Sequence, residues 1–287
     1  MIPLCLALLL GGWAAAEQPV AAPATGVRLD VPGGSIVYDD TGGSAPPIVF
    51  LHGAFMDRRT WDRQVEFFAE RYRVIRYDLR PFGESTRPDQ AYVVPDDLLR
   101  LLDHLKIDRA TLIGHSFGGA AALDFTLLYP GRVENLVLVS APPNGLNGPA
   151  DEAKASMAVF AAVKEGDDAI VKAWMAHPIW SVSSKMPAVA TEIETITRRN
   201  LAPFRMSFAP YVPVKPAAVG RLAEVKAPTL VIVGDLDSNG IRSGADLEAK
   251  QIPGALMAIV KGADHGLPIG WAAEFNAVVS GFLSRKP

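Results

Sequence analysis

The chain has 287 residues, 49% of them hydrophobic and 21% charged, so it is too apolar for a disordered protein and long enough for a large buried core. Lys and Arg number 28 against 31 Asp and Glu, a net charge of −3, which lacks the basic excess that neutralises nucleic-acid phosphates. We therefore expect a single catalytic-size domain with an insertion, and no nucleic-acid partner.

The first residues are typical of a secretory signal peptide. An apolar run up to Leu10 is followed by small residues up to Ala16, and no charged side chain precedes Glu17. The run is shorter than the roughly 20 apolar residues of a transmembrane helix, so no stable membrane anchor is expected. The only cysteine, Cys5, lies in this segment, so the mature chain would have no disulfide. We predict removal of residues 1–16 and export to the periplasm or outside the cell; an ordinary N-terminal segment is the alternative, because the usual positive charge is missing.

Short β-branched runs then alternate with longer amphipathic ones, a pattern that predicts a mostly parallel sheet flanked by helices. The first two runs are separated by Pro-Gly-Gly, whose glycines adopt positive φ at little cost, so they predict an antiparallel hairpin. Strands are predicted over residues 27–31, 35–39, 47–51, 73–77, 110–114, 133–139, 229–233 and 256–260. Helices are predicted over residues 60–71, 95–105, 117–129, 244–251 and 271–283.

The alternation stops in the second half of the chain. Residues 141–149 are rich in Pro, Gly and Asn, which is typical of a loop. The segment that follows is predicted to be helical and is rich in Ala and Met. Pro210, Pro213 and Pro216 then end it and return the chain to the core. We interpret residues 141–226 as an inserted helical lid. The core is then formed by residues 27–140 and 227–287.

Residues 114–119 (Gly-His-Ser-Phe-Gly-Gly) contain a G-x-S-x-G sequence, between a predicted strand and a predicted helix. In such a turn the serine has a strained backbone conformation, and Gly114 and Gly118 lack the Cβ atoms that would collide as strand and helix approach. The sequence alone also occurs in glycine-rich turns, but the strand before it and the helix after it favour a nucleophile elbow. Ser116 is therefore the candidate nucleophile.

A serine nucleophile needs a base, which a histidine can supply at neutral pH. His265 follows the last predicted strand, where a loop can return to the sheet edge above Ser116, and we predict it as the base. The other four histidines are expected to lack a direct catalytic role. They are His52, which would hold its loop, His104 on a helix surface, His115, whose ring would point away from the serine and pack or support the site, and His177 in the lid, solvated or facing substrate.

The base in turn needs an orienting carboxylate. Asp237 follows the strand 229–233, and the chain order serine, acid, histidine is typical of hydrolases. We favour Asp237 over Asp235, which would bond the turn backbone, and over Asp264 beside the histidine. An oxyanion would be stabilised by two backbone N–H groups, for which Ala54 and Phe117 have the expected positions.

These features resemble the α/β-hydrolase superfamily, and within it the small, lidded esterase and enol-lactonase-like branch. The resemblance extends over residues 27–283 and rests on residues 52–54 (His-Gly-Ala), on residues 78–85, and on the serine, aspartate and histidine above. It implies Ser116 as nucleophile, Asp237 as orienting acid, His265 as base, and Ala54 and Phe117 as oxyanion donors.

The chain departs from this family pattern in two places. Pro81 stands where the family usually has glycine, and residues 266–271 lack the acidic residue that commonly follows the base. The departures concern the shape of a loop and the wall of the pocket. Dehalogenases and epoxide hydrolases of this fold carry aspartate at the elbow, so Ser116 disfavours those reactions.

We therefore predict an α/β-hydrolase fold and a serine hydrolase that cleaves a carboxylic ester or lactone through an acyl-enzyme on Ser116. The sequence has no dinucleotide fingerprint, phosphate loop or metal-spaced cluster, so no cofactor or metal is expected. The expected substrate is a small apolar ester or lactone in a pocket lined by Phe55, Trp174 and Trp180, unless these only pack the lid onto the core. The alternatives are a carbon–carbon bond hydrolase with the same triad and a catalytically silent, ligand-binding member of the fold. The sequence does not indicate the oligomeric state.

Overall fold

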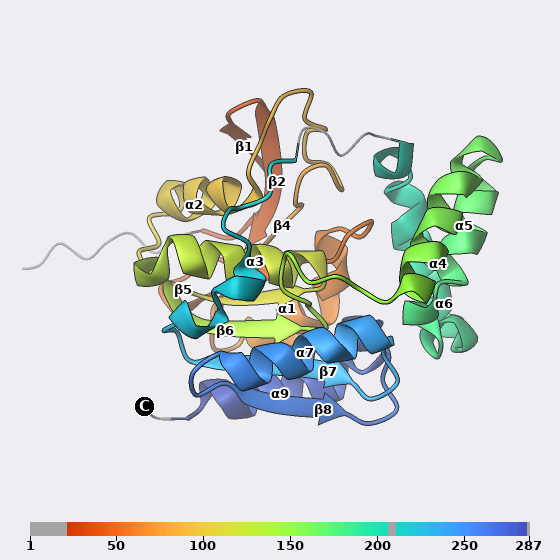
Figure 1. Ribbon diagram of the computed structural model, residues 1–287. Helices are drawn as coiled ribbons and strands as arrows, with labels where there is room; N and C mark the ends of the chain where they lie inside the picture. Colours follow the sequence, from red (N-terminus) through yellow and green to blue (C-terminus); the bar gives the residue numbers. More distant parts are fainter. Residues whose placement is uncertain (1–21, 206–210, 286–287) are drawn as a thin grey trace, which may run out of the picture.

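The computed structural model describes residues 22–205 and 211–285, so the predicted signal peptide and Cys5 lie outside the described residues. An eight-stranded sheet forms the centre, with the strand order β1-β2-β4-β3-β5-β6-β7-β8 (Figure 1). The two N-terminal strands form the predicted antiparallel hairpin, β2 pairs antiparallel with β4, and all other pairs are parallel. The strands are β1 (Ala24–Val31), β2 (Gly34–Asp40), β3 (Pro47–Leu51), β4 (Arg73–Tyr77), β5 (Ala110–His115), β6 (Val133–Val139), β7 (Thr229–Gly234) and β8 (Leu256–Val260). The predicted fold class is confirmed.

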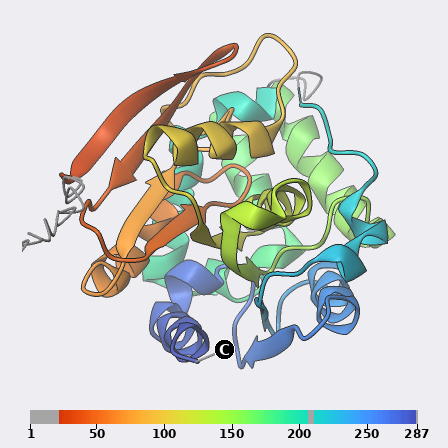
Figure 2. The ribbon, with the colours of Figure 1, turned by 90° about the vertical axis from the view of Figure 1, so that its left-hand side faces the viewer.

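Helices cover both faces of the sheet, which buries a separate apolar cluster on each face. One cluster includes Trp61, Phe68 and Phe275, and the other includes Leu101 and Phe125. Figure 2 shows two of these helices, α7 and α9, on either side of the blue strand β8. The core helices are α1 (Asp62–Phe68), α2 (Val94–His104), α3 (Phe117–Leu128), α7 (Asn239–Gln251), α8 (Leu267–Gly270) and α9 (Ala272–Leu283). Within the described residues, no helix combines the length and apolar character needed to cross a bilayer.

Helix α7 begins five residues before its predicted start, at Asn239 instead of Gly244. The prediction was wrong because glycine has a low helix propensity and the first turn contains Gly240. The structure explains the glycines by close packing. A Cβ atom on Gly240 would collide with the Glu152 side chain, and one on Gly244 would lie 2.7 Å from the Cβ atom of Pro142.

The described part of the predicted lid segment contains three helices and several 3₁₀ turns between β6 and β7. The helices are α4 (Ala150–Ala161), α5 (Asp167–Met175) and α6 (Pro187–Arg199), and the turns include Pro178–Trp180, Ser183–Lys185 and Ala202–Arg205. We call residues 150–205 the helical insertion. It lies beyond the carboxyl ends of the parallel strands, at the right in Figure 1.

Hydrogen bonds attach the helical insertion to core loops at widely separated points. The N–H of Gly240 donates to Glu152 on α4 at 2.7 Å, and Arg63 on α1 binds both carboxylate oxygens of Glu192 on α6 at 2.6 and 2.7 Å. The Ser181 hydroxyl donates to the carbonyl of Leu236 at 3.2 Å. The insertion is therefore held against the core along its length.

Helix α7 buries one carboxyl group that has no hydrogen-bond partner within the described residues, that of Glu248. Burial raises the pKa of Glu248 well above its ordinary value, because the charged form loses its hydration. The native protein therefore keeps this proton at pH values where the unfolded chain has lost it. Such a group lowers the free energy of unfolding as the pH rises above about 4, its ordinary pKa.

We expect Glu248→Gln to raise the free energy of unfolding at pH 8 by at least about 1.4 kcal/mol, the linkage energy of one pKa unit, because the neutral amide takes up no proton on folding. The effect should be small near pH 4, where the carboxyl group is largely protonated in both states. Urea unfolding between pH 4 and pH 9 measures both values. Asp246→Asn is the control, because Asp246 is an exposed carboxylate on the same helix. Parallel pH profiles for the wild type and Glu248→Gln would contradict the prediction.

Candidate active site

Ser116 stands alone between the end of β5 and the start of α3, with φ 52° and ψ −121°. Its N–H donates to the carbonyl of Val139 at 2.9 Å, and its carbonyl accepts from the N–H of Ala120 at 3.0 Å. A Cβ atom on Gly114 would lie 2.5 Å from the carbonyl oxygen of Gly118, so a side chain there would push strand and helix apart. The G-x-S-x-G segment therefore forms a strained turn at the carboxyl end of a central strand.

His265 and Asp237 come from the loops after β8 and β7 and form a buried pair. The Nδ1 atom of His265 lies 3.0 Å from Oδ2 of Asp237, and the other carboxylate oxygen accepts the N–H of Ser238 at 2.7 Å. The two side chains are 4% and 0% exposed. Because a carboxylate only accepts hydrogen bonds, Nδ1 carries the proton and Nε2 keeps its lone pair. The histidine is thus prepared to accept a proton at Nε2.

The two alternative acids are engaged elsewhere. Asp235 accepts the N–H of Gly262 at 2.6 Å, the turn-bonding role expected for it. The fully buried Asp264 accepts the N–H groups of Val182 at 2.8 Å and Ser183 at 2.7 Å, and also the hydroxyl of Ser183. Among the described residues, Asp237 is the carboxylate that hydrogen-bonds the His265 ring.

Two further histidines support the loops of the site. His115 donates from Nε2 to the carbonyl of His265 at 2.9 Å, and the two rings are 4.6 Å apart. His52 donates from Nδ1 to the carbonyl of Gly53 at 2.8 Å and accepts the N–H of Leu79 at Nε2 at 2.9 Å. Burial lowers the pKa of both imidazoles, that of His115 well below its usual value, so both are neutral supports.

The remaining two histidines lie outside this arrangement. His104 is exposed on α2, with Nε2 3.3 Å from the hydroxyl of Tyr38. His177 is only 6% exposed, and its Nε2 atom lies 3.2 Å from the Ser156 hydroxyl. The solvated alternative for His177 is therefore wrong, because the helical insertion buries the ring.

A tight turn over residues 53–56 passes beside the serine. The N–H of Met56 donates to the carbonyl of Gly53 at 3.3 Å, and a Cβ atom on Gly53 would lie 3.4 Å from that of Ser116. We call these four residues the oxyanion turn. The N–H groups of Ala54 and Phe117 have no acceptor within the described part of the chain. Both backbone donors are available to an oxygen atom close to Ser116.

Aromatic side chains from the core and the insertion meet at this turn. The Phe55 ring stacks on Phe204 with centroids 3.7 Å apart and meets Trp174 at 5.3 Å. Trp180 lies 5.6 Å from both Trp174 and the His265 ring. The structure therefore brings together the three predicted substrate residues, each less than a tenth exposed. Phe204, a further aromatic residue of the insertion, belongs to the same group.

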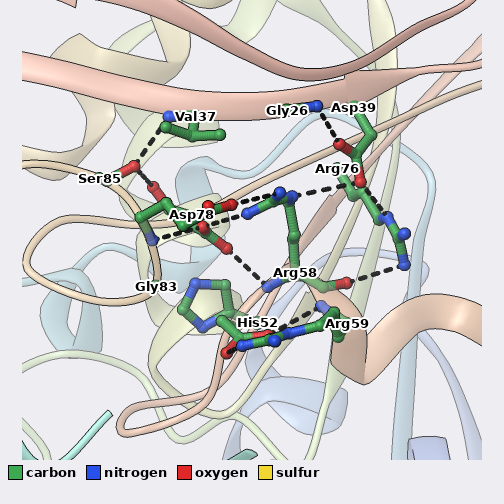
Figure 3. A network of polar contacts seen from close by, with 12 residues as sticks. Gly26, Val37, Asp39, His52, Arg58, Arg59, Arg76, Asp78, Gly83 and Ser85 are labelled. Atoms are coloured by element: carbon green, nitrogen blue, oxygen red, sulfur yellow. Dashed lines mark hydrogen bonds and ion pairs between the residues drawn. The ribbon is translucent and has the colours of Figure 1, made fainter. Parts of the chain in front are cut away.

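An ion-pair network centres on Arg58, two residues after the oxyanion turn (Figure 3). The Arg58 guanidinium contacts the buried carboxylate of Asp78 at 2.5 Å, Asp39 at 3.2 Å and Glu84 at 2.6 Å. Gly83 has φ 58°, and a Cβ atom there would collide with the Asp78 carboxylate. The network therefore fixes the loop of residues 78–85, whose Leu79 N–H binds the His52 ring.

This loop is also where the chain departs from the family pattern. The peptide bond between Arg80 and Pro81 is cis, and the Arg80 guanidinium forms a buried ion pair with Asp97 at 2.7 Å.

Within the described residues, no group of three or more His, Cys, Asp or Glu side chains is arranged to hold a metal ion.

A known protein family and several solved structures are similar to this chain. A family model described as the alpha/beta hydrolase fold matches residues 46–182. The solved enol-lactonase of Burkholderia xenovorans is similar, with a TM-score of 0.77 and 26% identity, over 90% of this chain and 100% of that one. The chain has the α/β-hydrolase fold. A thermophilic esterase of Thermogutta terrifontis is another similar structure, with a TM-score of 0.74 and 25% identity, over 92% of this chain and 98% of that one.

The curated relatives of this α/β-hydrolase agree with the fold and differ in their reactions. A Bacillus subtilis protein named as a putative 2-succinyl-6-hydroxy-2,4-cyclohexadiene-1-carboxylate synthase is 27% identical, over 86% of this chain and 94% of its own length. Other relatives reach 32–39% identity, but the match covers only 30–40% of their own length. The fold and the names of the similar proteins together indicate a hydrolase that acts on small molecules.

Proposed function

We propose that this α/β-hydrolase cleaves a carboxylic ester or lactone by acyl transfer to Ser116 and then to water. The observation that carries the proposal is the His265–Asp237 pair, which fixes the proton on Nδ1 and leaves Nε2 free to act as a base. The serine elbow stands at the end of β5, and the His115 side chain, adjacent in sequence, is hydrogen-bonded to the backbone of the base.

In the proposed reaction the Ser116 hydroxyl attacks the ester carbonyl while Nε2 of His265 takes its proton. The carbonyl oxygen becomes negative and accepts hydrogen bonds from the N–H groups of Ala54 and Phe117. His265 then gives the proton to the leaving oxygen, and the acyl-enzyme forms. Water, activated by the same histidine, releases the acid and restores the serine.

The proposed substrate is a small ester or lactone with an apolar part, because Trp180 packs against the ring of the proposed base and Trp174 packs against Phe55 of the oxyanion turn. We further propose that the helical insertion serves as the lid of this site. The esterase and the enol-lactonase among the similar structures are consistent with either form of the bond.

Turnover of a series of p-nitrophenyl esters of increasing acyl length, together with simple lactones, tests the proposal. We expect hydrolysis with a clear optimum of chain length, because a pocket of fixed size accepts some acyl groups better than others. A fluorophosphonate probe should label the serine of the same enzyme. Cleavage of a vinylogous diketone without ester turnover would favour the carbon–carbon hydrolase, and no labelling would favour the silent ligand-binding protein.

A further inference from the structure

The side chain of Asn200 joins the helical insertion to two core loops that flank the site. It follows α6 and is 1% exposed. Its Nδ2 atom donates to Oδ2 of Asp57 at 2.8 Å and to the carbonyl of Ile196 at 2.9 Å, and its Oδ1 atom accepts the N–H of Gly83 at 2.7 Å. Both amide hydrogens are used, so the side chain has a single defined orientation.

Asp57 directly follows the oxyanion turn and fixes its end. The carboxylate is fully buried and accepts hydrogen bonds from the backbone N–H of Arg59 at 3.1 Å and from Nε of the same residue at 2.8 Å. The Asp57 carbonyl accepts the N–H of Thr60 at 3.0 Å, which begins the 3₁₀ turn Arg58–Trp61. Asn200 therefore binds the carboxylate that anchors the turn carrying the Ala54 N–H.

The centre of the oxyanion turn is strained and is held from the same part of the insertion. Phe55 has φ 60°, a left-handed conformation that costs a non-glycine residue roughly 1–2 kcal/mol, so neighbouring contacts must hold it. Its ring stacks on Phe204 with an angle of 10° between the planes. Phe204 lies in the 3₁₀ turn Ala202–Arg205, which begins two residues after Asn200. The insertion thus contacts the turn at its strained centre and at its anchored end.

We propose that Asn200 is a positioning residue, which holds the oxyanion turn through Asp57 and so directs the Ala54 N–H toward the developing oxyanion. The Phe204 ring assists by holding Phe55. This inference rests on the proposed esterase function. In this proposal the helical insertion not only lines the pocket but also helps to stabilise the transition state. The reason is that an N–H donor displaced by a fraction of an ångström binds the oxyanion less well.

The test compares Asn200→Ala with Thr197→Val in the full-length protein. Thr197 lies on α6, is fully buried, and its hydroxyl has no partner within residues 22–205 and 211–285, so it controls for general damage to the helix. Steady-state hydrolysis of the best p-nitrophenyl ester gives kcat and KM. Inhibition by a trifluoromethyl ketone, which forms a tetrahedral adduct with the serine, reports the oxyanion site directly. Phe204→Leu is the second variant, since it loosens Phe55 and leaves the amide contacts in place.

We expect Asn200→Ala to lower kcat by about 10–100-fold, to change KM little, and to weaken the trifluoromethyl ketone by the same factor as kcat. Thr197→Val should behave as the wild type. An increase in KM without a decrease in kcat would overturn the proposal. An unchanged affinity for the ketone, or an equal decrease in kcat in Thr197→Val, would also overturn it. If Asn200→Ala does not fold, Asn200→Ser takes its place, and unchanged kcat and ketone affinity in that variant would overturn the proposal. Unchanged values in Phe204→Leu would overturn the assisting role of the Phe204 ring. Absence of ester hydrolysis in the wild type is a separate outcome, which removes the proposed function itself.

Discussion

Replacement of Ser116 by alanine is expected to lower kcat for ester hydrolysis by about 10⁶-fold, the loss usual when a triad nucleophile is removed. The oxyanion donors and the aromatic pocket remain, so KM should change little. Turnover of the p-nitrophenyl ester series measures the rate, and labelling by a fluorophosphonate should disappear. The fold should persist, because alanine is smaller than serine and the backbone hydrogen bonds of the elbow do not involve the hydroxyl.

Ser140→Ala is the matched control for this variant. Ser140 also has positive φ, at 48°, and is fully buried, and its hydroxyl has no partner within the described residues. Its loss should leave ester turnover close to that of the wild type. If Ser116→Ala hydrolyses esters as well as the wild type, the nucleophile is a different group and the proposed mechanism is wrong.

Asp237→Asn is expected to lower kcat by about 10⁴-fold without loss of fold, as for an orienting aspartate in a serine triad. The N–H of Ser238 lies 2.7 Å from one carboxylate oxygen and will retain the amide oxygen of the asparagine. The amide NH₂ group then faces Nδ1 of His265. Because this group only donates hydrogen bonds, Nδ1 must accept one and cannot carry the proton. The imidazole proton moves to Nε2, the atom that must take the serine proton, and the base is held in the wrong tautomer.

Asp235→Asn is the control on the same loop, because its amide oxygen can still accept the N–H of Gly262. We expect little change in kcat for this variant. Far-UV circular dichroism and thermal unfolding should agree between both variants and the wild type. Equal losses in the two variants would contradict the selection of Asp237 as the orienting acid.

The sheet and the nucleophile turn could be predicted because their signals are local. A buried parallel strand is apolar throughout, and the G-x-S-x-G segment needs only the strand before it and the helix after it. The beginning of α7 could not be predicted, because its glycines lower the helix propensity and are explained only by their contact with Glu152 and Pro142. Tertiary packing, which no short window of sequence contains, decided that boundary.

The same distinction divides the candidate site. Asp237 and His265 each follow a predicted strand, so the topology alone predicts that they approach the same edge of the sheet. The contacts of Asn200 join residues 143 and 117 positions apart in the chain, to Asp57 and to Gly83. No periodicity or motif signals a contact of that kind. The left-handed Phe55 was equally unpredictable, since that conformation favours glycine.

The contact between Asp264 and the insertion has a consequence for how the substrate range of such a protein can change. The Asp264 carboxylate binds the backbone N–H groups of Val182 and Ser183, and every residue except proline carries that donor. At position 182, where the contact uses only the backbone, the side chain can change without loss of this attachment. In the proposed enzyme, in which the insertion covers the substrate, substitutions at such positions change the substrate's surroundings and leave the insertion attached to the loop of His265. At residue 182 the backbone N–H provides the attachment, and the side chain is free to differ between related proteins.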